Sequence, residues 1–204
     1  MRYFVAHLLS GEAKEYHSRL TREFSNTFHT VPLHERIPPH ITIKPPFETN
    51  EAGIQEVERI LRAFAAGERA VPFVLRGFGR FGFRTVYMDA IKNTEAVSFV
   101  RSCIKTLNAN IPWMPAYPLE GNKLHASVAR FLTRRQYRHI WRHVKNHTPD
   151  FSVSFDNIAI LKKENGAWSV HALIALPSGR GEEYSGYMVA GQYGNSLQSF
   201  HHSK

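Results

Sequence analysis

The chain has 204 residues, 43% of them hydrophobic, which is enough to form the core of one ordinary domain or of two small lobes. No stretch approaches the roughly 20 apolar residues that cross a bilayer, and residues 1–9 become polar too early for a signal peptide, so we expect no membrane partner. A formal charge of +9 favours an anionic partner, with nucleic acid the first choice.

The first half of the chain is predicted to alternate strands with helices, because apolar residues recur at the periods of a strand and of a helix in turn. Pro45 and Pro46 are expected to end the second strand, since proline cannot donate to a sheet ladder. A turn rich in glycine and phenylalanine joins the last two strands. The expected elements are a strand at 2–9, a helix at 11–28, a strand at 40–44, a helix at 51–66 and strands at 71–79 and 84–91.

The second half is predicted to repeat this alternation. A helix at 94–109 carries the single cysteine, Cys103, which excludes an internal disulfide and favours a reduced, cytoplasmic compartment. We expect a domain over residues 1–176 and a polar tail over residues 177–204. The further elements are a strand at 124–128, a helix at 133–147 and a hairpin of strands 151–162 and 167–176 that turns at Asn165-Gly166.

A short pattern occurs twice, 85 positions apart, as Pro39-His40-Ile41-Thr42-Ile43 and Leu124-His125-Ala126-Ser127-Val128. On a strand, residues i and i+2 point to one face, so each copy places a histidine beside a hydroxyl. His201 and Ser203 also match, but they lie in the polar tail without apolar alternation.

The two halves share one order of elements, which is motif strand, amphipathic helix and hairpin. This order predicts an internal duplication of roughly 85 residues whose copies pair about a pseudo-twofold axis. His40 and His125 then occupy equivalent positions, and we expect them to meet across one cleft.

Two imidazoles and two hydroxyls around one cleft can move protons on and off the oxygens of a phosphodiester without a metal. An imidazole with a pKa of about 6.5 is available in either form near neutral pH. His139, His143 and His147 recur at helical spacing, but no carboxylate or cysteine nearby completes a ligand set and the adjacent cations would repel a metal. We therefore expect neither a metal nor another cofactor.

The chain resembles the 2H phosphoesterase superfamily and, within it, the 2'-5' RNA ligase-like (LigT-like) branch. The likeness covers about residues 1–176 and lies in both motifs, in Leu75-Arg76-Gly77-Phe78-Gly79-Arg80-Phe81 with Val86-Tyr87-Met88, and in His125-Ala126-Ser127-Val128-Ala129-Arg130. It implies a bilobal α+β fold in which two antiparallel sheets line a central cleft and helices lie outside. It also implies hydrolysis of 2',3'-cyclic phosphate ends of RNA or nucleotides to 2'-phosphates, with reversible 2'-5' RNA ligation as an activity that the resemblance allows. We expect a monomer.

By the family's pattern, His40 donates a proton to the leaving 3' oxygen and His125 accepts one from water, and the two roles exchange in ligation. Thr42 and Ser127 would donate hydrogen bonds to the non-bridging phosphate oxygens. Both are also ordinary constituents of strands, so a purely structural role stays open.

Two cations near the motifs are further candidates for binding the phosphate. Lys44 shares the alternation face of His40 and Thr42, so it could reach the phosphate or else face solvent at the strand end. Arg130 corresponds to the family arginine, but strict alternation places it opposite His125. It reaches the cleft only if the strand ends or bulges before it. Four rings could stack on a base or belong to the core: Phe78, Phe81, Phe83 and Tyr87.

The charge is concentrated after the second motif, where every charged residue between Glu120 and Asp150 is positive. These residues form either a solvated helix face or a surface that docks RNA. The leading hypothesis is thus a metal-independent cyclic phosphodiesterase. The alternatives are a non-catalytic nucleotide- or RNA-binding module on the same fold and a basic structural protein with coincidental histidines.

Overall fold

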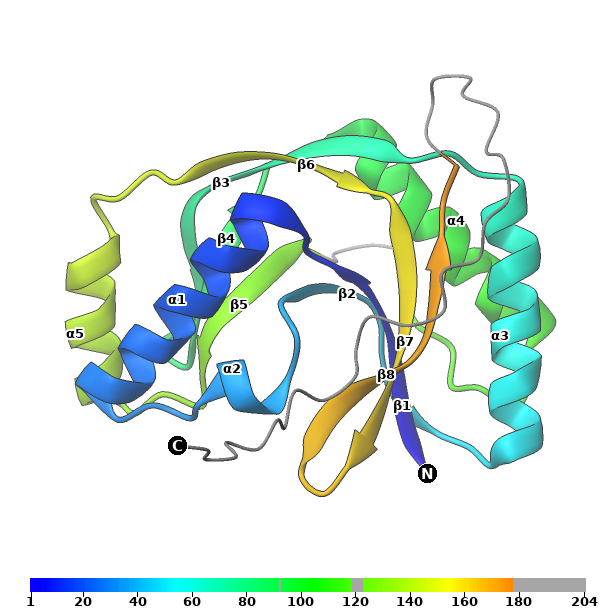
Figure 1. Ribbon diagram of the computed structural model, residues 1–204, viewed down its shortest axis with the longest axis horizontal. Helices are drawn as coiled ribbons and strands as arrows, with labels where there is room; N and C mark the ends of the chain where they lie inside the picture. The colour runs from blue at the N-terminus through cyan, green and yellow to red at the C-terminus, as the bar shows by residue number, and fades with distance from the viewer. Residues whose placement is uncertain (92, 119–122, 178–204) are drawn as a thin grey trace, which may run out of the picture.

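In a computed structural model of the chain, which describes residues 1–91, 93–118 and 123–177, two antiparallel four-stranded sheets approach each other at their motif strands (Figure 1). The strands are β1 (Arg2–Leu8), β2 (His40–Glu48), β3 (Val71–Phe81), β4 (Thr85–Ala90), β5 (His125–Arg130), β6 (Asp150–Phe155), β7 (Asn157–Glu164) and β8 (Ala167–Ala175). The helices are α1 (Gly11–Phe28), α2 (Leu33–Arg36), α3 (Glu51–Ala66), α4 (Thr94–Asn110) and α5 (Arg134–Val144).

The strand order is β2-β1-β7-β8 in the first sheet and β5-β4-β3-β6 in the second. Apart from the short α2, each half runs strand, helix, motif strand, helix and strand, beginning at β1 and at β4. In both sheets the motif strand lies at the edge and pairs with the first strand of its own half. That first strand then pairs with β7 in the first sheet and with β3 in the second. The pseudo-twofold α+β fold is thereby confirmed, and the expected repeat gains a strand before each motif.

The helices cover the outside of the sheets at two ends of the molecule (Figure 1). α1 and α5 lie together at one end, and α3 packs against α4 at the other. No helix within the described residues is both long and apolar enough to cross a membrane.

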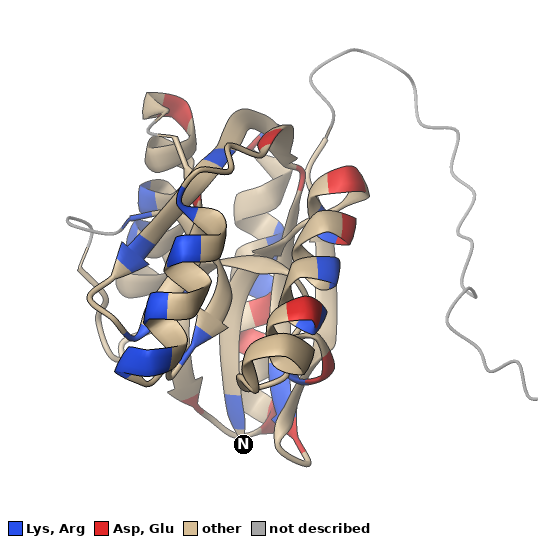
Figure 2. Cartoon of the chain, turned by 90° about the vertical axis from the view of Figure 1, so that its left-hand side faces the viewer, with Lys and Arg blue, Asp and Glu red and all other residues tan. Residues whose placement is uncertain are grey.

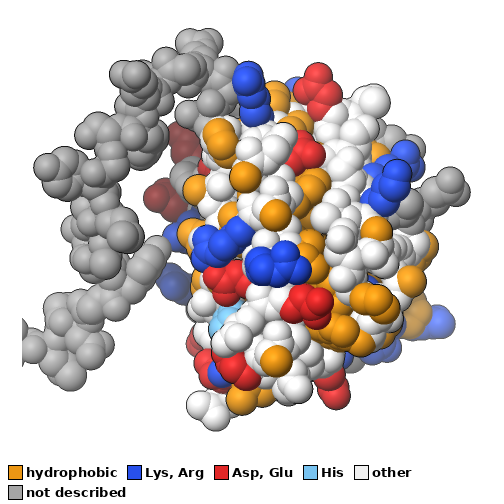
Figure 3. All heavy atoms as spheres, turned by 90° about the vertical axis from the view of Figure 1, so that its right-hand side faces the viewer, with side chains coloured by type: hydrophobic (Ala, Val, Ile, Leu, Met, Phe, Trp, Pro, Cys, Tyr) orange, Lys and Arg blue, Asp and Glu red, His pale blue; other side chains and the backbone are white. Residues whose placement is uncertain are grey.

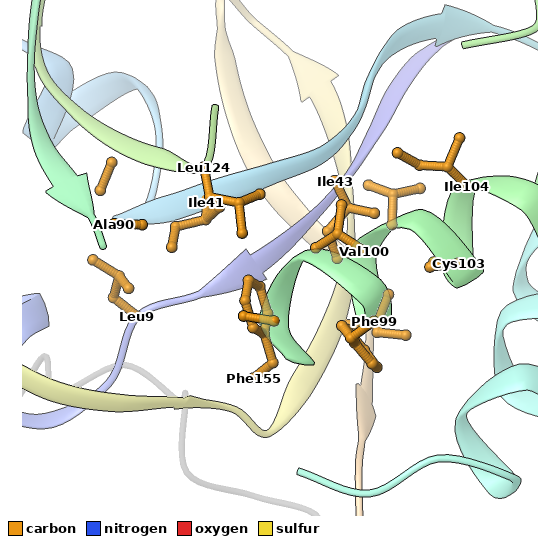
Figure 4. Close-up of a cluster of buried hydrophobic side chains, with 14 of the residues drawn as sticks. Leu9, Ile41, Ile43, Ala90, Phe99, Val100, Cys103, Ile104, Leu124 and Phe155 are labelled. Atoms are coloured by element: carbon orange, nitrogen blue, oxygen red, sulfur yellow. The ribbon is translucent and has the colours of Figure 1, made fainter. Parts of the chain in front are cut away.

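The apolar core lies behind the motif strands and fixes their register. Ile41 and Ile43 of β2 are fully buried and point toward Val100 of α4 and Phe155 of β6 (Figure 4). A slip of β2 by one residue would expose these isoleucines and bury His40, at a cost of about 1.5–3 kcal/mol for each isoleucine. Cys103 belongs to the same core, and its burial raises the pKa of the thiol to about 12.

The structure corrects two predicted strands, and both errors come from pairing between strands. β2 does not end at Pro45 but continues to Glu48, because a register shift between Tyr3 and Val5 accommodates the prolines on an edge strand that has no outer partner. The predicted strand 151–162 is two strands, since the chain crosses from one sheet to the other at Asp156. Of the predicted tail, all but Pro177 lies outside the described residues.

Candidate active site

Both motif histidines line one pocket of about 390 Å³, together with both motif hydroxyls. His40 and Thr42 come from β2, and His125 and Ser127 come from β5. Arg130 lines the same pocket, at the end of β5. The structure therefore brings together five of the six predicted site residues from the facing edges of the two sheets.

The two imidazoles are oriented by the same local contact. The Nδ1 of His40 lies 2.8 Å from the carbonyl oxygen of Pro38, and the Nδ1 of His125 lies 2.7 Å from that of Lys123, in each case two residues earlier in the chain. Because a carbonyl oxygen only accepts, Nδ1 carries the proton in both rings. Each neutral ring consequently has a free electron pair on Nε2, which is the arrangement that a proton acceptor requires.

Aromatic walls hold the two rings. The His125 ring lies 4.8 Å from the Phe81 ring and 5.0 Å from the Tyr87 ring, measured between centroids. His40 packs on Phe4 at 5.2 Å. Both imidazoles are half-buried, so they remain open to the pocket while their orientations are fixed.

Burial also sets the protonation of the pair. It lowers the pKa of His40 to about 4 against the opposing effect of the Pro38 hydrogen bond, and His17, Arg130 and His125 lower it further. The pKa of His125 is lowered too, mainly by burial and also by Arg130. Both rings are thus neutral near pH 7 in the free protein, and a negative charge entering the pocket would favour their protonated forms.

A bulge in each motif strand decides which cation reaches the pocket. Val5 pairs with Lys44 and Ala6 with Thr42, so Ile43 has no partner on β1. In β5, Val86 pairs with Ala129 and Tyr87 with Ser127, so Val128 has no partner on β4. An unpaired residue reverses the alternation that follows it.

The reversal brings Arg130 to the face of His125 and Ser127, as its place in the pocket shows. The bulge in β2 instead turns Lys44 away from the pocket. Lys44 was expected either to reach the phosphate or to face solvent at the strand end, and both expectations are wrong. Lys44 is only 4% exposed, does not line the pocket, donates a hydrogen bond to the carbonyl oxygen of Pro115 and has its ammonium 5.4 Å from the centroid of the Tyr117 ring.

The aromatic candidates separate in the same way. Phe81 lines the pocket, whereas Tyr87 is buried behind His125 and Phe83 lies under the guanidinium of Arg134. Phe78 packs against the core. Tyr117, which the sequence did not single out, also lines the pocket.

Sequence reasoning also missed His17, a buried residue on α1. Its Nε2 lies 2.9 Å from the carbonyl oxygen of Ser127, so the ring supports the motif strand from behind. Its Nδ1 is buried without a hydrogen-bond partner among the described residues. The available signal was a histidine that shares the apolar helical stripe of Leu20 and Phe24.

Lys123 is a second residue that was not assigned to the site. It lines the pocket, and its ammonium lies 2.9 Å from Oδ2 of Asp89. Asp89 pairs with His125 in the sheet. The pocket thus holds two cations close to one histidine.

The histidines of α5 have other contacts. The Nε2 of His143 lies 2.9 Å from Oε1 of Glu23, and the His139 ring stacks on Phe28. Within residues 1–91, 93–118 and 123–177, no group of three or more histidine, cysteine or acidic side chains is arranged to hold a metal ion.

The chain is similar to one known protein family. Residues 11–167 match the model of the 2'-5' RNA ligase superfamily. A Geobacillus thermodenitrificans (strain NG80-2) protein named "Putative phosphoesterase" is 26% identical over 159 residues, which are 76% of this chain and 88% of that protein. A Bacillus pumilus (strain SAFR-032) protein of the same name is 28% identical over 153 residues, covering 71% and 83% of the two chains.

Two solved structures have the same fold. TT0787 of Thermus thermophilus superposes with a TM-score of 0.62 at 17% identity, over 88% of this chain and all of that one. LigT of E. coli complexed with 3'-AMP superposes with a TM-score of 0.56 at 12% identity, over 87% of this chain and 98% of that one.

Proposed function

This chain belongs to the 2'-5' RNA ligase superfamily and is a phosphoesterase of the 2H type, and from that premise we propose that it opens 2',3'-cyclic phosphate ends of RNA or nucleotides to 2'-phosphates without a metal. His40 and His125 act as the acid and base. The observation that carries the proposal is that one pocket contains two imidazoles whose Nδ1 atoms are both engaged by backbone carbonyls. Each ring then has Nε2 available for proton transfer.

In the hydrolytic direction, His125 accepts a proton from water as the water oxygen attacks phosphorus. The bond between phosphorus and the ribose 3' oxygen breaks, and His40 gives its proton to that oxygen. One P–O bond forms and one breaks, so the product is a 2'-phosphate with a free 3' hydroxyl. If a ribose 5' hydroxyl took the place of water, the same step would form a 2'-5' linkage, with His125 taking the proton of that hydroxyl and His40 protonating the 3' oxygen. The two roles exchange in the opposite direction, in which the 3' hydroxyl attacks phosphorus and the 5' oxygen leaves.

The remaining polar residues of the pocket stabilise the charge on the phosphate. Thr42 and Ser127 donate hydrogen bonds to the non-bridging oxygens, and the guanidinium of Arg130 offsets the negative charge that develops in the transition state. The same phosphate favours a proton on the histidine pair, which opposes the effect of burial on the pKa of His40. A phosphate on a ribose oxygen suits this pocket, and the related fold of LigT was solved with 3'-AMP.

The test is hydrolysis of 2',3'-cyclic AMP in EDTA, with the product identified by ³¹P NMR. We expect 2'-AMP from the wild-type protein and loss of turnover in both His40→Ala and His125→Ala, since each variant removes one proton carrier. His147→Ala, on the exposed end of the α5 region, is the control and should be active. Full activity in either motif variant would refute the two-histidine mechanism, and nucleotide binding without any product would instead indicate a binding module.

A further inference from the structure

One face of α5 carries a cluster of positive charge that the catalytic pocket does not use. We define the α5 basic face as the exposed side chains of Arg134, Arg135, Arg138, Arg142 and Lys145. Residues at spacings of three and four are neighbours on a helix surface, and like charges at those spacings oppose helix formation. No carboxylate among the described residues forms an ion pair with this face. The ion pairs of the described residues thus leave the positive charge of this face uncompensated, and such a face favours an anionic partner.

The rest of the surface is different. In Figure 2 all the charged residues on α5 are basic, whereas α1 beside it carries charges of both signs. On the opposite side of the molecule, acidic and basic side chains are interspersed (Figure 3), and Arg62 of α3 is paired with Glu58 at 2.6 Å. The positive charge of the chain is thus gathered at one end, which is the pattern of a protein that binds a polyanion.

The α5 basic face is continuous with the pocket. Arg130 lines the pocket, and its guanidinium lies 5.2 Å from the centroid of Phe131. Arg134, one turn further on, lies 5.0 Å above the ring of Phe83. Arg80, from β3, donates a hydrogen bond of 2.7 Å to the Tyr137 hydroxyl, so it adds a further cation beside α5. Cations therefore alternate with aromatic rings from the mouth of the pocket onto the helix, an arrangement that suits single-stranded nucleic acid.

Phe131 is the exposed ring in this series. It is 61% exposed, and its backbone has a φ of 59°, a left-handed conformation that costs energy for a residue with a bulky side chain. The strain holds an apolar ring in solvent between the pocket and α5. A base that stacked on this ring would remove its apolar surface from water.

α5 is fixed in place as a docking surface requires. Thr133 and Gln136 form a capping box at its start, and the Gln136 amide also donates to the carbonyl oxygens of Phe28 and His29 at the end of α1. The helix is about 16 Å long. It extends well beyond the space that one nucleotide would occupy in the pocket.

We propose that the α5 basic face and Phe131 dock the body of an RNA strand whose 3'-terminal cyclic phosphate enters the pocket, so that RNA binds more tightly than a free nucleotide. The proposal rests on the proposed function and adds to it the path of the strand. A cyclic phosphate lies at the 3' end, and all other nucleotides lie on its 5' side. The strand therefore leaves the pocket in one direction, past Arg130 and onto α5.

The test compares two triple variants on two substrates. Arg134→Gln, Arg138→Gln and Arg142→Gln together neutralise the α5 basic face. Arg59→Gln, Arg69→Gln and Lys105→Gln remove the same charge from exposed positions around α3 and α4. The substrates are a single-stranded RNA dodecamer with a 2',3'-cyclic phosphate end and 2',3'-cyclic AMP.

For the dodecamer, we expect the α5 variant to raise KM by about tenfold or more, and its salt dependence to fall by about 2 in the slope of log K against log salt. Turnover of cyclic AMP should be retained, because no pocket residue is changed. The control variant should keep the wild-type KM for the dodecamer. If the α5 variant kept that KM, or if both variants lost affinity equally, the docking surface would be refuted while the proposed hydrolysis stood.

Phe131→Ala provides a second test without any change of charge, in case the triple variant does not fold. It should raise KM for the dodecamer several-fold and leave that for cyclic AMP unchanged, and an unchanged KM for both would contradict stacking on this ring. If the wild-type protein hydrolysed neither substrate, the proposed function would fail. Fluorescence anisotropy of a labelled dodecamer with each triple variant would then decide the docking surface by itself.

Discussion

Ile43 and Val128 occupy the same place in the two halves of the molecule, as each is the residue without a partner three positions after a motif histidine. In each half the bulge turns the residue two positions later toward the pocket. That residue is Arg130 in the second motif strand and Pro45 in the first. The intervening positions, Lys44 and Ala129, are buried. The chemistry of the pocket thus depends on a feature of strand pairing and not only on the motif residues.

The first prediction follows from the bulges and contrasts the two cations. Arg130→Gln should lower kcat/KM for 2',3'-cyclic AMP by about 10²-fold, because it removes a charge that stabilises the transition state. Lys44→Met should cause a much smaller loss, since the Lys44 ammonium bonds the Pro115 carbonyl outside the pocket. Steady-state kinetics of both variants would test this difference, and a larger loss in the lysine variant would contradict it.

The second prediction concerns the pH dependence of catalysis. One imidazole must hold a proton while the other is free, and this state is most populated between the two pKa values. The pKa of His40 is about 4, and that of His125 is below its usual value of 6.5. We therefore expect kcat/KM, which reports the free enzyme, to be greatest on the acidic side of pH 6.5. Samples held at each pH and assayed at pH 7 would separate titration from unfolding, and an optimum above pH 7.5 would contradict this assignment.

The third prediction concerns stability toward acid. Burial lowers the pKa of His7 and of His17 to about 4, although hydrogen bonds to the Asn157 and Ser127 carbonyls act in the opposite direction. Between about pH 6.5 and 4 the unfolded chain binds more protons than the folded one, so stability is present above pH 6.5 and is lost as the pH falls. Each histidine should contribute a slope of up to about 1.4 kcal/mol per pH unit in that range.

Chemical denaturation between pH 4.5 and 8 would measure this slope. His17→Gln, which keeps a donor for the Ser127 carbonyl, should reduce it by the contribution of one histidine. The exposed His147→Gln is the matched control. An equal slope in all three proteins would show that His17 does not couple folding to protonation.

The fourth prediction concerns the wall behind His125. A Cβ added at Gly79 would overlap the Tyr87 ring, which packs against His125. Gly79→Ala should therefore destabilise the protein by about 1–3 kcal/mol and lower kcat by displacing the imidazole. Gly67→Ala is the control, because Gly67 has a φ of −94° and its nearest neighbour atom would be 3.7 Å from the new Cβ. Thermal unfolding and kcat of both variants would test this, and wild-type values for Gly79→Ala would contradict it.

Much of the fold could be read from local patterns. The ranges of α1 and α3 agree with their predicted positions, and α4 extends only one residue further, because their apolar faces recur at helical spacing. The crossing at Asp156 could not be predicted, since residues 151–162 read as one continuous strand and only their pairing with β3 and β1 divides them. His17 was missed for a related reason, because its contact with Ser127 joins residues 110 positions apart.

The sequence by itself determined the two motifs, their equivalent places in a repeat, and the face that each motif histidine shares with its hydroxyl, since alternation along one strand depends only on neighbouring residues. The tertiary structure decided which cation reaches the pocket. The bulges at Ile43 and Val128 arise where β1 and β4 skip a residue of the motif strands. A skipped residue is a property of two strands packed together, so the sequence of one strand does not contain it.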